Sequence, residues 1–115
     1  GNRDHGAPVD ALDEHVRQII ERVWDVVPPG SQVAVFGSYA RGTSSATSDL
    51  DVLVIEPRLA ASHIDEIYRI KKAVQAGVPA LDLHVIGTDW YERQSAIQGT
   101  LPAIVKREGL FIDQP

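Results

Sequence analysis

The amino-acid sequence predicts one α/β or α+β domain, in which helices pack on a small sheet. Three apolar segments have the length and composition of strands, at residues 32–36, 50–55 and 80–86. The segments around them carry apolar residues at helical spacing and are bounded by proline, glycine or capping residues. The order helix, strand, strand, helix, strand, helix, helix is typical of such a domain.

Length and composition limit the class of protein. A chain of 115 residues buries about two thirds of its unfolded surface on folding, so we expect a single domain over residues 1–115, with 1–9 flexible. Hydrophobic residues make up 43% and charged residues 23%, as in ordinary soluble proteins. No apolar run has the length of a membrane span, and residues 1–6 lack the apolar core of a signal peptide. We therefore expect a cytoplasmic protein with no membrane partner.

Charge and cysteine content exclude further classes. The sequence has no cysteine, which rules out disulfides and thiol chemistry. Its net charge of −5 disfavours broad, non-specific binding of nucleic acid, which depends on a basic surface that displaces counterions. A small basic pocket remains compatible with this charge, so nucleic acid is a possible but less favoured partner.

The first helix is predicted over residues 10–27, with Asp10 as its N-cap. Its apolar residues share one face, and Trp24 is expected to pack in the core. Pro28 ends the helix, because proline cannot continue it and the residue before proline avoids the α region. A strand over residues 32–36 follows.

The second long helix is predicted from Ser62 through Ala76. Residues 62–65 resemble a capping box, and Gly77 occupies the position after the helix end. The side chains expected on its inner side are Ile64, Ile67, Tyr68, Ile70, Lys71 and Val74.

The remaining elements follow Pro79. Residues 80–86 alternate as a strand, which places Asp82 and His84 on one face together with Ile86. Thr88 is predicted to cap a helix over residues 89–97. A last helix over 101–108 and a short edge strand over 110–112 complete the chain.

The most informative stretch is residues 33–55, an apolar strand, a Gly-Ser turn, a polar loop and a second strand that opens with two aspartates. Because side chains alternate along a strand, Asp49 and Asp51 should project from one face. Two carboxylates this close repel each other unless a cation lies between them. A divalent metal ion is the simplest partner.

The turn before this strand has the features of a phosphate site. Gly37 allows the backbone to approach an anion, and Ser38 begins a short helix whose free amide groups face the same side. The Ser38 hydroxyl and the Arg41 guanidinium can contact a triphosphate. Asp82, on a later strand, is a third carboxylate that is expected to help bind metal and to take up the acceptor proton.

Two of these residues also have a structural explanation. Arg41 could be a surface residue that merely pairs with an aspartate, and Ser38 could only cap its helix. His84 shares the face of Asp82, but a lone histidine is more often packed or solvated than ligating, so we leave it outside the predicted site.

The two motifs together resemble the nucleotidyltransferase superfamily of DNA polymerase β, and in particular its minimal (MNT-type) members. Residues 37–42 read Gly-Ser-Tyr-Ala-Arg-Gly and residues 48–51 read Ser-Asp-Leu-Asp, with ten residues between Ser38 and Asp49. Asp82 matches the third acid of that family by its position in a later strand. The resemblance covers residues 10–112.

This resemblance implies a fold, an activity and a set of ligands. The fold is the polymerase β-like one, a mixed sheet with flanking helices. The activity is transfer of a nucleoside monophosphate from ATP or another NTP with release of pyrophosphate. The cofactor is Mg²⁺, with two ions in the site. The metal ligands and catalytic residues are Asp49, Asp51 and Asp82, and the nucleotide-binding residues are Gly37, Ser38 and Arg41.

The acceptor is the remaining question, and three interpretations are open. Minimal members resemble the antitoxins of HEPN/MNT toxin–antitoxin pairs, in which the MNT protein transfers AMP to a tyrosine of its HEPN-type toxin (AMPylation). We favour this one, because little of the chain is left over to form an acceptor domain. The alternatives are transfer to an RNA or tRNA 3′ end, and a non-catalytic module that silences a toxin by binding it.

Overall fold

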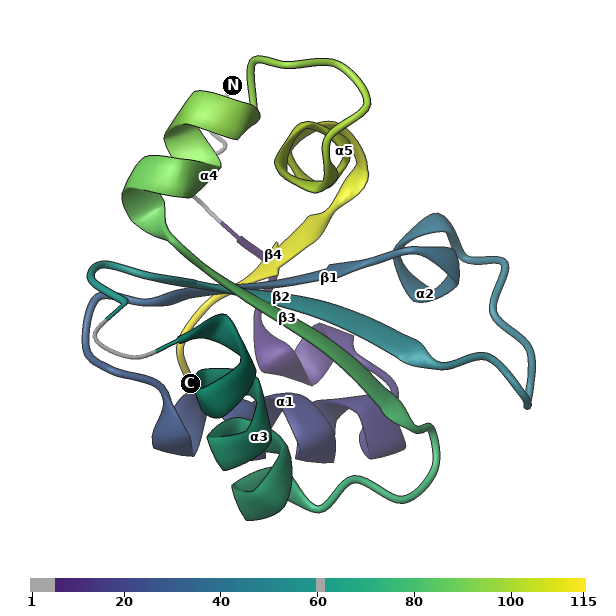
Figure 1. The fold of residues 1–115 in the computed structure, drawn as a ribbon. Helices are drawn as coiled ribbons and strands as arrows, with labels where there is room; N and C mark the ends of the chain where they lie inside the picture. Colours follow the sequence, from purple (N-terminus) through teal and green to yellow (C-terminus); the bar gives the residue numbers. More distant parts are fainter. Residues whose placement is uncertain (1–5, 60–61) are drawn as a thin grey trace.

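The computed structural model describes residues 6–59 and 62–115 and consists of a sheet with helices on both faces (Figure 1). Within these residues the sheet has four strands in the order β3-β2-β1-β4. β1 runs antiparallel to β2 and β4, whereas β2 and β3 are parallel. The predicted α/β fold with a mixed sheet is therefore confirmed. The strands are β1 (Gln32–Phe36), β2 (Leu50–Glu56), β3 (Leu81–Gly87) and β4 (Leu110–Ile112).

Two helices, α1 (Glu14–Val26) and α3 (His63–Val74), cover one face of the sheet (Figure 1). The main core lies between them and the strands, and Trp24 packs against its border. Strand alternation sends every second apolar side chain into this layer. Its strand residues are Val33, Val35, Leu50, Val52, Val54, Leu81, Leu83, Val85 and Ile112.

The opposite face carries α4 (Thr88–Gln94) and α5 (Leu101–Glu108), which pack over a smaller core (Figure 1). This core consists of Ala34, Leu53, Ile55, Ile86 and Val105. The bounds predicted for α5 and for the edge strand β4 are confirmed. Both faces of β2 are thus covered, which explains why this strand is an almost unbroken apolar run.

The start of α1 differs from the prediction. Asp10 lies in a separate 3₁₀ turn, η1 (Val9–Ala11), and the N-cap is Asp13, whose side chain accepts the His15 backbone N–H at 3.1 Å. The prediction was wrong because Leu12 is extended (ψ 154°) and interrupts the helical backbone between the two aspartates.

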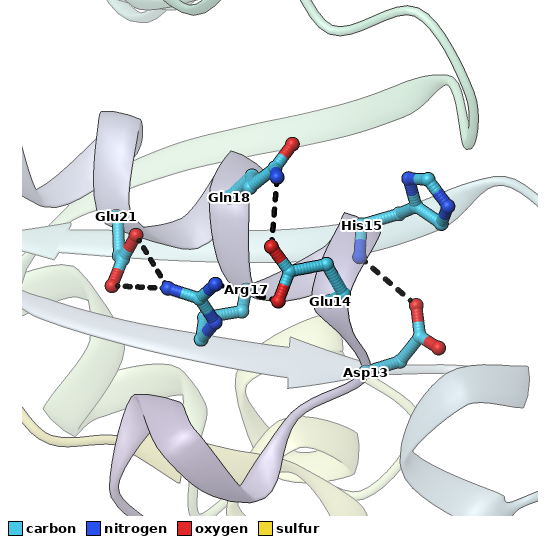
Figure 2. A network of polar contacts seen from close by, with 6 residues as sticks. All are labelled: Asp13, Glu14, His15, Arg17, Gln18 and Glu21. Carbon is cyan, nitrogen blue, oxygen red and sulfur yellow. Dashed lines mark hydrogen bonds and ion pairs between the residues drawn. The ribbon is translucent and has the colours of Figure 1, made fainter.

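Side-chain pairs stabilise the first turns of α1 (Figure 2). Arg17 donates to Glu14 at 2.6 Å and to both carboxylate oxygens of Glu21 at 3.1 and 3.0 Å. Gln18 donates to the other oxygen of Glu14. Pairs three and four residues apart on an exposed helix contribute about 0.2–0.5 kcal/mol each. They support the helix without fixing its position on the sheet.

The Ser62 cap of α3 is confirmed, since its hydroxyl accepts the Asp65 N–H at 3.1 Å. The helix ends earlier than predicted, at Val74, and Gln75 rather than Gly77 adopts the left-handed conformation, with φ 50°. The backbone N–H of Gln75 is used to close the last turn on the Lys71 carbonyl. The extension of the helix to residue 76 was therefore wrong.

The inner face of α3 was predicted only in part: Ile67 packs against the core as predicted, but Lys71 is exposed. Ile64 and Tyr68 are 77% and 66% exposed, whereas Glu66 is buried. Glu66 faces inward because Arg69 holds its carboxylate at 2.9 and 2.8 Å and the buried Glu56 lies opposite. Ile70 and Val74 do pack in the core as predicted.

The N-terminal segment contacts the outer edge of β4. Ala7 donates its N–H to the Phe111 carbonyl and accepts the Asp113 N–H, at 2.7 and 2.8 Å. Val9 is buried in the main core. Residues 6–9, which the sequence led us to expect as flexible, are thus attached to the sheet, and residues 1–5 lie outside the described part of the chain.

The connection into α4 differs in its capping residue. Thr88 is the first residue of the helix instead of its cap, and its hydroxyl donates to the Glu56 carbonyl at 3.1 Å. The helix ends at Gln94 rather than at Ile97. Among the helices of residues 6–59 and 62–115, none has the length and apolar character needed to cross a bilayer.

Candidate active site

Asp51 and Asp82 lie side by side across two parallel strands. They are partners in the register of β2 and β3, so their side chains project from the same face of the sheet. Burial raises the pKa of Asp51 above its usual value, and the hydrogen bond with Asp82 and the charge of Asp82 raise it further. Two carboxyl groups predicted from separate motifs therefore meet at one point.

Asp49 is placed differently from the prediction. It lies in the loop one residue before β2, so strand alternation does not fix the direction of its side chain. Its negative charge still contributes to the raised pKa of Asp51, as the smallest of the causes. The statement that β2 opens with two aspartates was wrong, because Leu50 is the first residue in the ladder, paired with Leu81.

Gly37 is packed directly against Asp51. It follows β1 and has φ 71° and ψ −150°, a conformation that residues with a Cβ avoid. A Cβ at this position would collide with the Oδ2 atom of the Asp51 carboxyl group. The glycine of the Gly-Ser turn thus allows the backbone to lie on the carboxylate, and a side chain here would separate the two.

The turn continues into α2 (Ser38–Arg41), whose first residue is Ser38, as predicted. Figure 1 shows α2, the loop that leads to β2 and the start of β3 at the same end of the sheet. The predicted nucleotide-binding residues Gly37 and Ser38 therefore lie at the end of the sheet that carries the aspartates.

Arg41 points to a different partner in this structure. Its Nη1 atom lies 3.8 Å from Oε1 of Glu108 at the end of α5, and both side chains are partly exposed. This is the surface pairing considered from the sequence, with a glutamate in place of an aspartate. Exposed pairs of this kind contribute about 0–1 kcal/mol, so a nucleotide phosphate can compete for the guanidinium.

His84 and Phe36 are two site neighbours that sequence reasoning left out. His84 Nε2 lies 3.6 Å from Asp82 Oδ1, and its ring packs on Phe36 with centroids 5.7 Å apart at 51°. Phe36 is in turn the register partner of Asp51. The sequence did contain a signal for His84, because the alternation of side chains along β3 places it on the same face as Asp82.

The acidic side chains at this end of the sheet offer a metal ion few protein ligands. Within residues 6–59 and 62–115, no group of three or more histidine, cysteine or acidic side chains is arranged to hold one. The Asp51–Asp82 pair nevertheless offers hard oxygen donors whose mutual repulsion a cation would relieve. Mg²⁺ usually binds through one or two carboxylates together with substrate phosphates. The pair therefore fits a Mg²⁺ ion that binds together with the nucleotide.

Comparison with known proteins agrees with this geometry. The model of the nucleotidyltransferase domain family matches residues 16–106, which include β1, the glycine turn and all three aspartates. The chain belongs to this family. As a nucleotidyltransferase domain it is a transferase, and the family implies an NTP substrate.

A solved structure supports the same assignment. The crystal structure of a protein from Sulfolobus solfataricus, described as a "putative nucleotidyltransferase", is similar with a TM-score of 0.55 and 26% sequence identity. The match covers 74% of this chain and 75% of that one. No curated protein matches the chain.

Proposed function

We propose that this nucleotidyltransferase transfers AMP from ATP to a hydroxyl group of a partner protein, in the cytoplasm, as the antitoxin of an HEPN/MNT pair. The observation that carries the transferase chemistry is the Asp51–Asp82 carboxyl pair, with the Gly37 turn packed on it. Such an arrangement brings a metal-binding group and a phosphate-binding turn to one end of the sheet.

Each predicted residue has a role in this reaction. The backbone at Gly37 and Ser38 receives the triphosphate, and Arg41 leaves Glu108 to pair with it. Asp51 and Asp82 would hold Mg²⁺, and Asp49, from the loop before β2, would join them in a full site for two ions once its carboxylate turns toward the pair. When bound, Mg²⁺ would neutralise phosphate charge and polarise the phosphoryl oxygens.

The transfer itself is a displacement at the α-phosphorus. The acceptor oxygen forms a bond to this phosphorus, the bond to the bridging oxygen of the β-phosphate breaks, and pyrophosphate leaves. Asp82 accepts the proton of the acceptor hydroxyl. This role suits Asp82 because its side chain is 53% exposed, whereas Asp51 lies half-buried under the Gly37 turn.

The partner is proposed to be a basic, RNA-handling protein that supplies a tyrosine hydroxyl. Reaction requires the acceptor oxygen to be held in line with the α-phosphate, and such positioning supplies much of the rate. A net charge of −5 complements a basic protein surface and disfavours a long nucleic-acid backbone.

The experiment uses the protein with ATP, Mg²⁺ and the product of the adjacent gene, followed by intact-mass spectrometry. The proposal is supported if that product gains AMP when the enzyme is present at well below one equivalent. Asp51→Asn is the inactive control. Label that appears on RNA instead assigns the acceptor to an RNA 3′ end. If the toxin is neutralised only by one equivalent of this protein, and without ATP, the protein is a binding module.

A further inference from the structure

We propose that His84 is a positioning residue for Asp82: its imidazole N–H orients the exposed Asp82 carboxylate toward Asp51, and Phe36 holds the ring in place. This inference deepens the proposed function and rests on it for the kinetic part of its test. Asp82 is the more exposed member of the carboxyl pair. Because β3 lies at the edge of the sheet, strand pairing gives Asp82 a neighbour on one side only, Asp51.

The contacts of the imidazole extend in two directions. On one side its Nε2 atom lies 3.6 Å from Asp82 Oδ1, within ion-pair distance and slightly beyond a hydrogen bond. On the other side the ring packs on Phe36 at a 5.7 Å centroid separation. Because Phe36 pairs with Asp51 in the sheet, the ring rests on the same strand segment that carries the first carboxylate.

These contacts form a closed circuit of side chains and backbone pairs around the site. Phe36 is next to Asp51 on β1 and β2, Asp51 is next to Asp82 on β2 and β3, and His84 returns from Asp82 to Phe36. Hydrogen bonds at active sites are often long in the unliganded protein and tighten when substrate is bound. The 3.6 Å distance between Nε2 and Asp82 Oδ1 has to shorten to about 3.2 Å for this hydrogen bond to form.

A partner of this kind has a measurable effect. Groups that hydrogen-bond to metal-binding side chains fix their orientation, and their removal typically costs 10–100-fold in metal affinity or activity. His84 is 41% exposed, so replacing it does not open a cavity in the core. The loss on substitution should therefore fall on metal binding and turnover, and the fold should be preserved.

The test compares His84→Leu, which removes the donor, with His84→Gln, which keeps an amide N–H near the position of Nε2. His15→Leu is the matched control, because His15 is an exposed histidine on α1. Binding of Mn²⁺ with a non-hydrolysable ATP analogue is followed by electron paramagnetic resonance, and kcat and KM are measured for transfer. His84→Leu should weaken Mn²⁺ binding and lower kcat by about 10–100-fold, with a smaller change in the KM for ATP. His84→Gln should recover most of the loss.

An independent readout uses the metal-free protein. Long-range ¹H–¹⁵N spectra of the histidine ring should show the proton on Nε2 in the neutral ring, and Asp82→Asn should change the ring nitrogen shifts. The role of His84 would be overturned if His84→Leu kept the native Mn²⁺ binding and kcat. It would also be overturned if Nε2 carried no proton and Asp82→Asn left the ring nitrogen shifts unchanged.

The outcomes separate this inference from the proposed function. If the native protein transfers no nucleotide but His84→Leu weakens binding of the Mn²⁺–nucleotide, the proposed reaction fails and the role of His84 stands. If transfer to the partner protein occurs and is equally fast in His84→Leu, the proposed reaction stands and the role of His84 fails.

Discussion

The carboxyl group of Glu56, at the end of β2, faces the carboxylate of Glu66 on α3 in the interior of the domain. Arg69 binds the Glu66 carboxylate at 2.9 and 2.8 Å and donates to the Val26 carbonyl of α1 at 2.8 Å. Glu56 is 2% exposed, and its Oε2 atom finds no hydrogen-bond partner among the described residues. The two glutamates therefore share one negative charge, on Glu66, and one proton, on Glu56.

The first prediction follows from the titration of this pair. Burial, followed by the hydrogen bond and charge of Glu66, raises the pKa of Glu56 to about 8, although Arg69 opposes this shift. The hydrogen bonds from Arg69 and Glu56 lower the pKa of Glu66 to about 2. From pH 4.5 to about 8 the native state retains a proton on Glu56 that the unfolded chain releases. The free energy of unfolding should consequently fall as pH rises through this window.

The effect of Glu66 has the opposite sign at lower pH. Its contribution is present above pH 4.5 and is lost as pH falls toward about 2. For Glu56, urea unfolding of the native protein should show a loss on the order of 4 kcal/mol between about pH 5 and about pH 8. Glu56→Gln, which remains neutral, should abolish that loss, and an unchanged pH dependence in the variant would refute this account.

Asp51→Asn should abolish transfer without unfolding the domain. The amide cannot supply the second carboxylate, so we expect kcat to fall by more than about 100-fold. Because Asp51 and Asp82 repel each other, the neutral amide should leave the free energy of unfolding unchanged or slightly higher. Steady-state kinetics with thermal unfolding of the same samples tests both statements, and retained transfer would remove Asp51 from the site.

Asp82→Ala should separate chemistry from binding. Asp82 is more exposed than Asp51 and is proposed to face the acceptor, so kcat should decrease more than the affinity for ATP. Calorimetric titration with ATP and Mg²⁺ gives the affinity, and single-turnover transfer gives the rate. A variant with native turnover would leave the proton-acceptor role without support.

Gly37→Ala should destabilise the turn and impair transfer, and Gly42→Ala is its matched control. Both glycines have a positive φ, 71° and 75°, but only a Cβ at Gly37 meets the Asp51 carboxyl group, whereas a Cβ at Gly42 meets no atom within 4 Å. The left-handed backbone of Gly42 costs an alanine about 1–2 kcal/mol, and the backbone of Gly37, with ψ −150°, costs it on the order of 1–3 kcal/mol. Gly37→Ala should cost more and displace Asp51, so loss of transfer in this variant alone is the expected result.

Glu108→Gln should increase the affinity for ATP. The substitution releases Arg41 from its 3.8 Å ion pair and leaves the guanidinium available to the triphosphate. Stability should change by less than about 1 kcal/mol, because the pair is exposed. Nucleotide titration of Glu108→Gln and Arg41→Ala measures the effect, and equal affinities in both variants would show that Arg41 does not bind the phosphates.

The sequence predicted correctly those helices and strands whose start and end are marked by residues close together in the chain. β1, α5 and β4 were predicted with the observed bounds, because proline, glycine and capping residues mark their ends. The start of α1 was missed because Asp10 and Asp13 are equally good caps, and only the extended backbone at Leu12 distinguishes them. The sequence contains no local signal for that backbone conformation.

Contacts between distant segments account for the other differences. The orientation of α3 depends on the burial of Glu66 opposite Glu56, and a helical pattern that counts apolar residues assigns a glutamate to the solvent face. Asp49 and Asp51 were predicted from their motif and Asp82 from its place in a later strand, but the pairing of Asp51 with Asp82 depends on the register of two parallel strands. The Glu108 partner of Arg41 likewise comes from another helix.

The attachment of Ala7 to β4 has a practical consequence for handling the protein. The outer edge of β4 presents the Phe111 carbonyl and the Asp113 amide, and Ala7 occupies both. Exposed strand edges recruit further chains and promote aggregation. A truncation that removes Ala7 uncovers this edge, so a shortened version should be more prone to precipitate during purification even though it retains Asp49, Asp51 and Asp82.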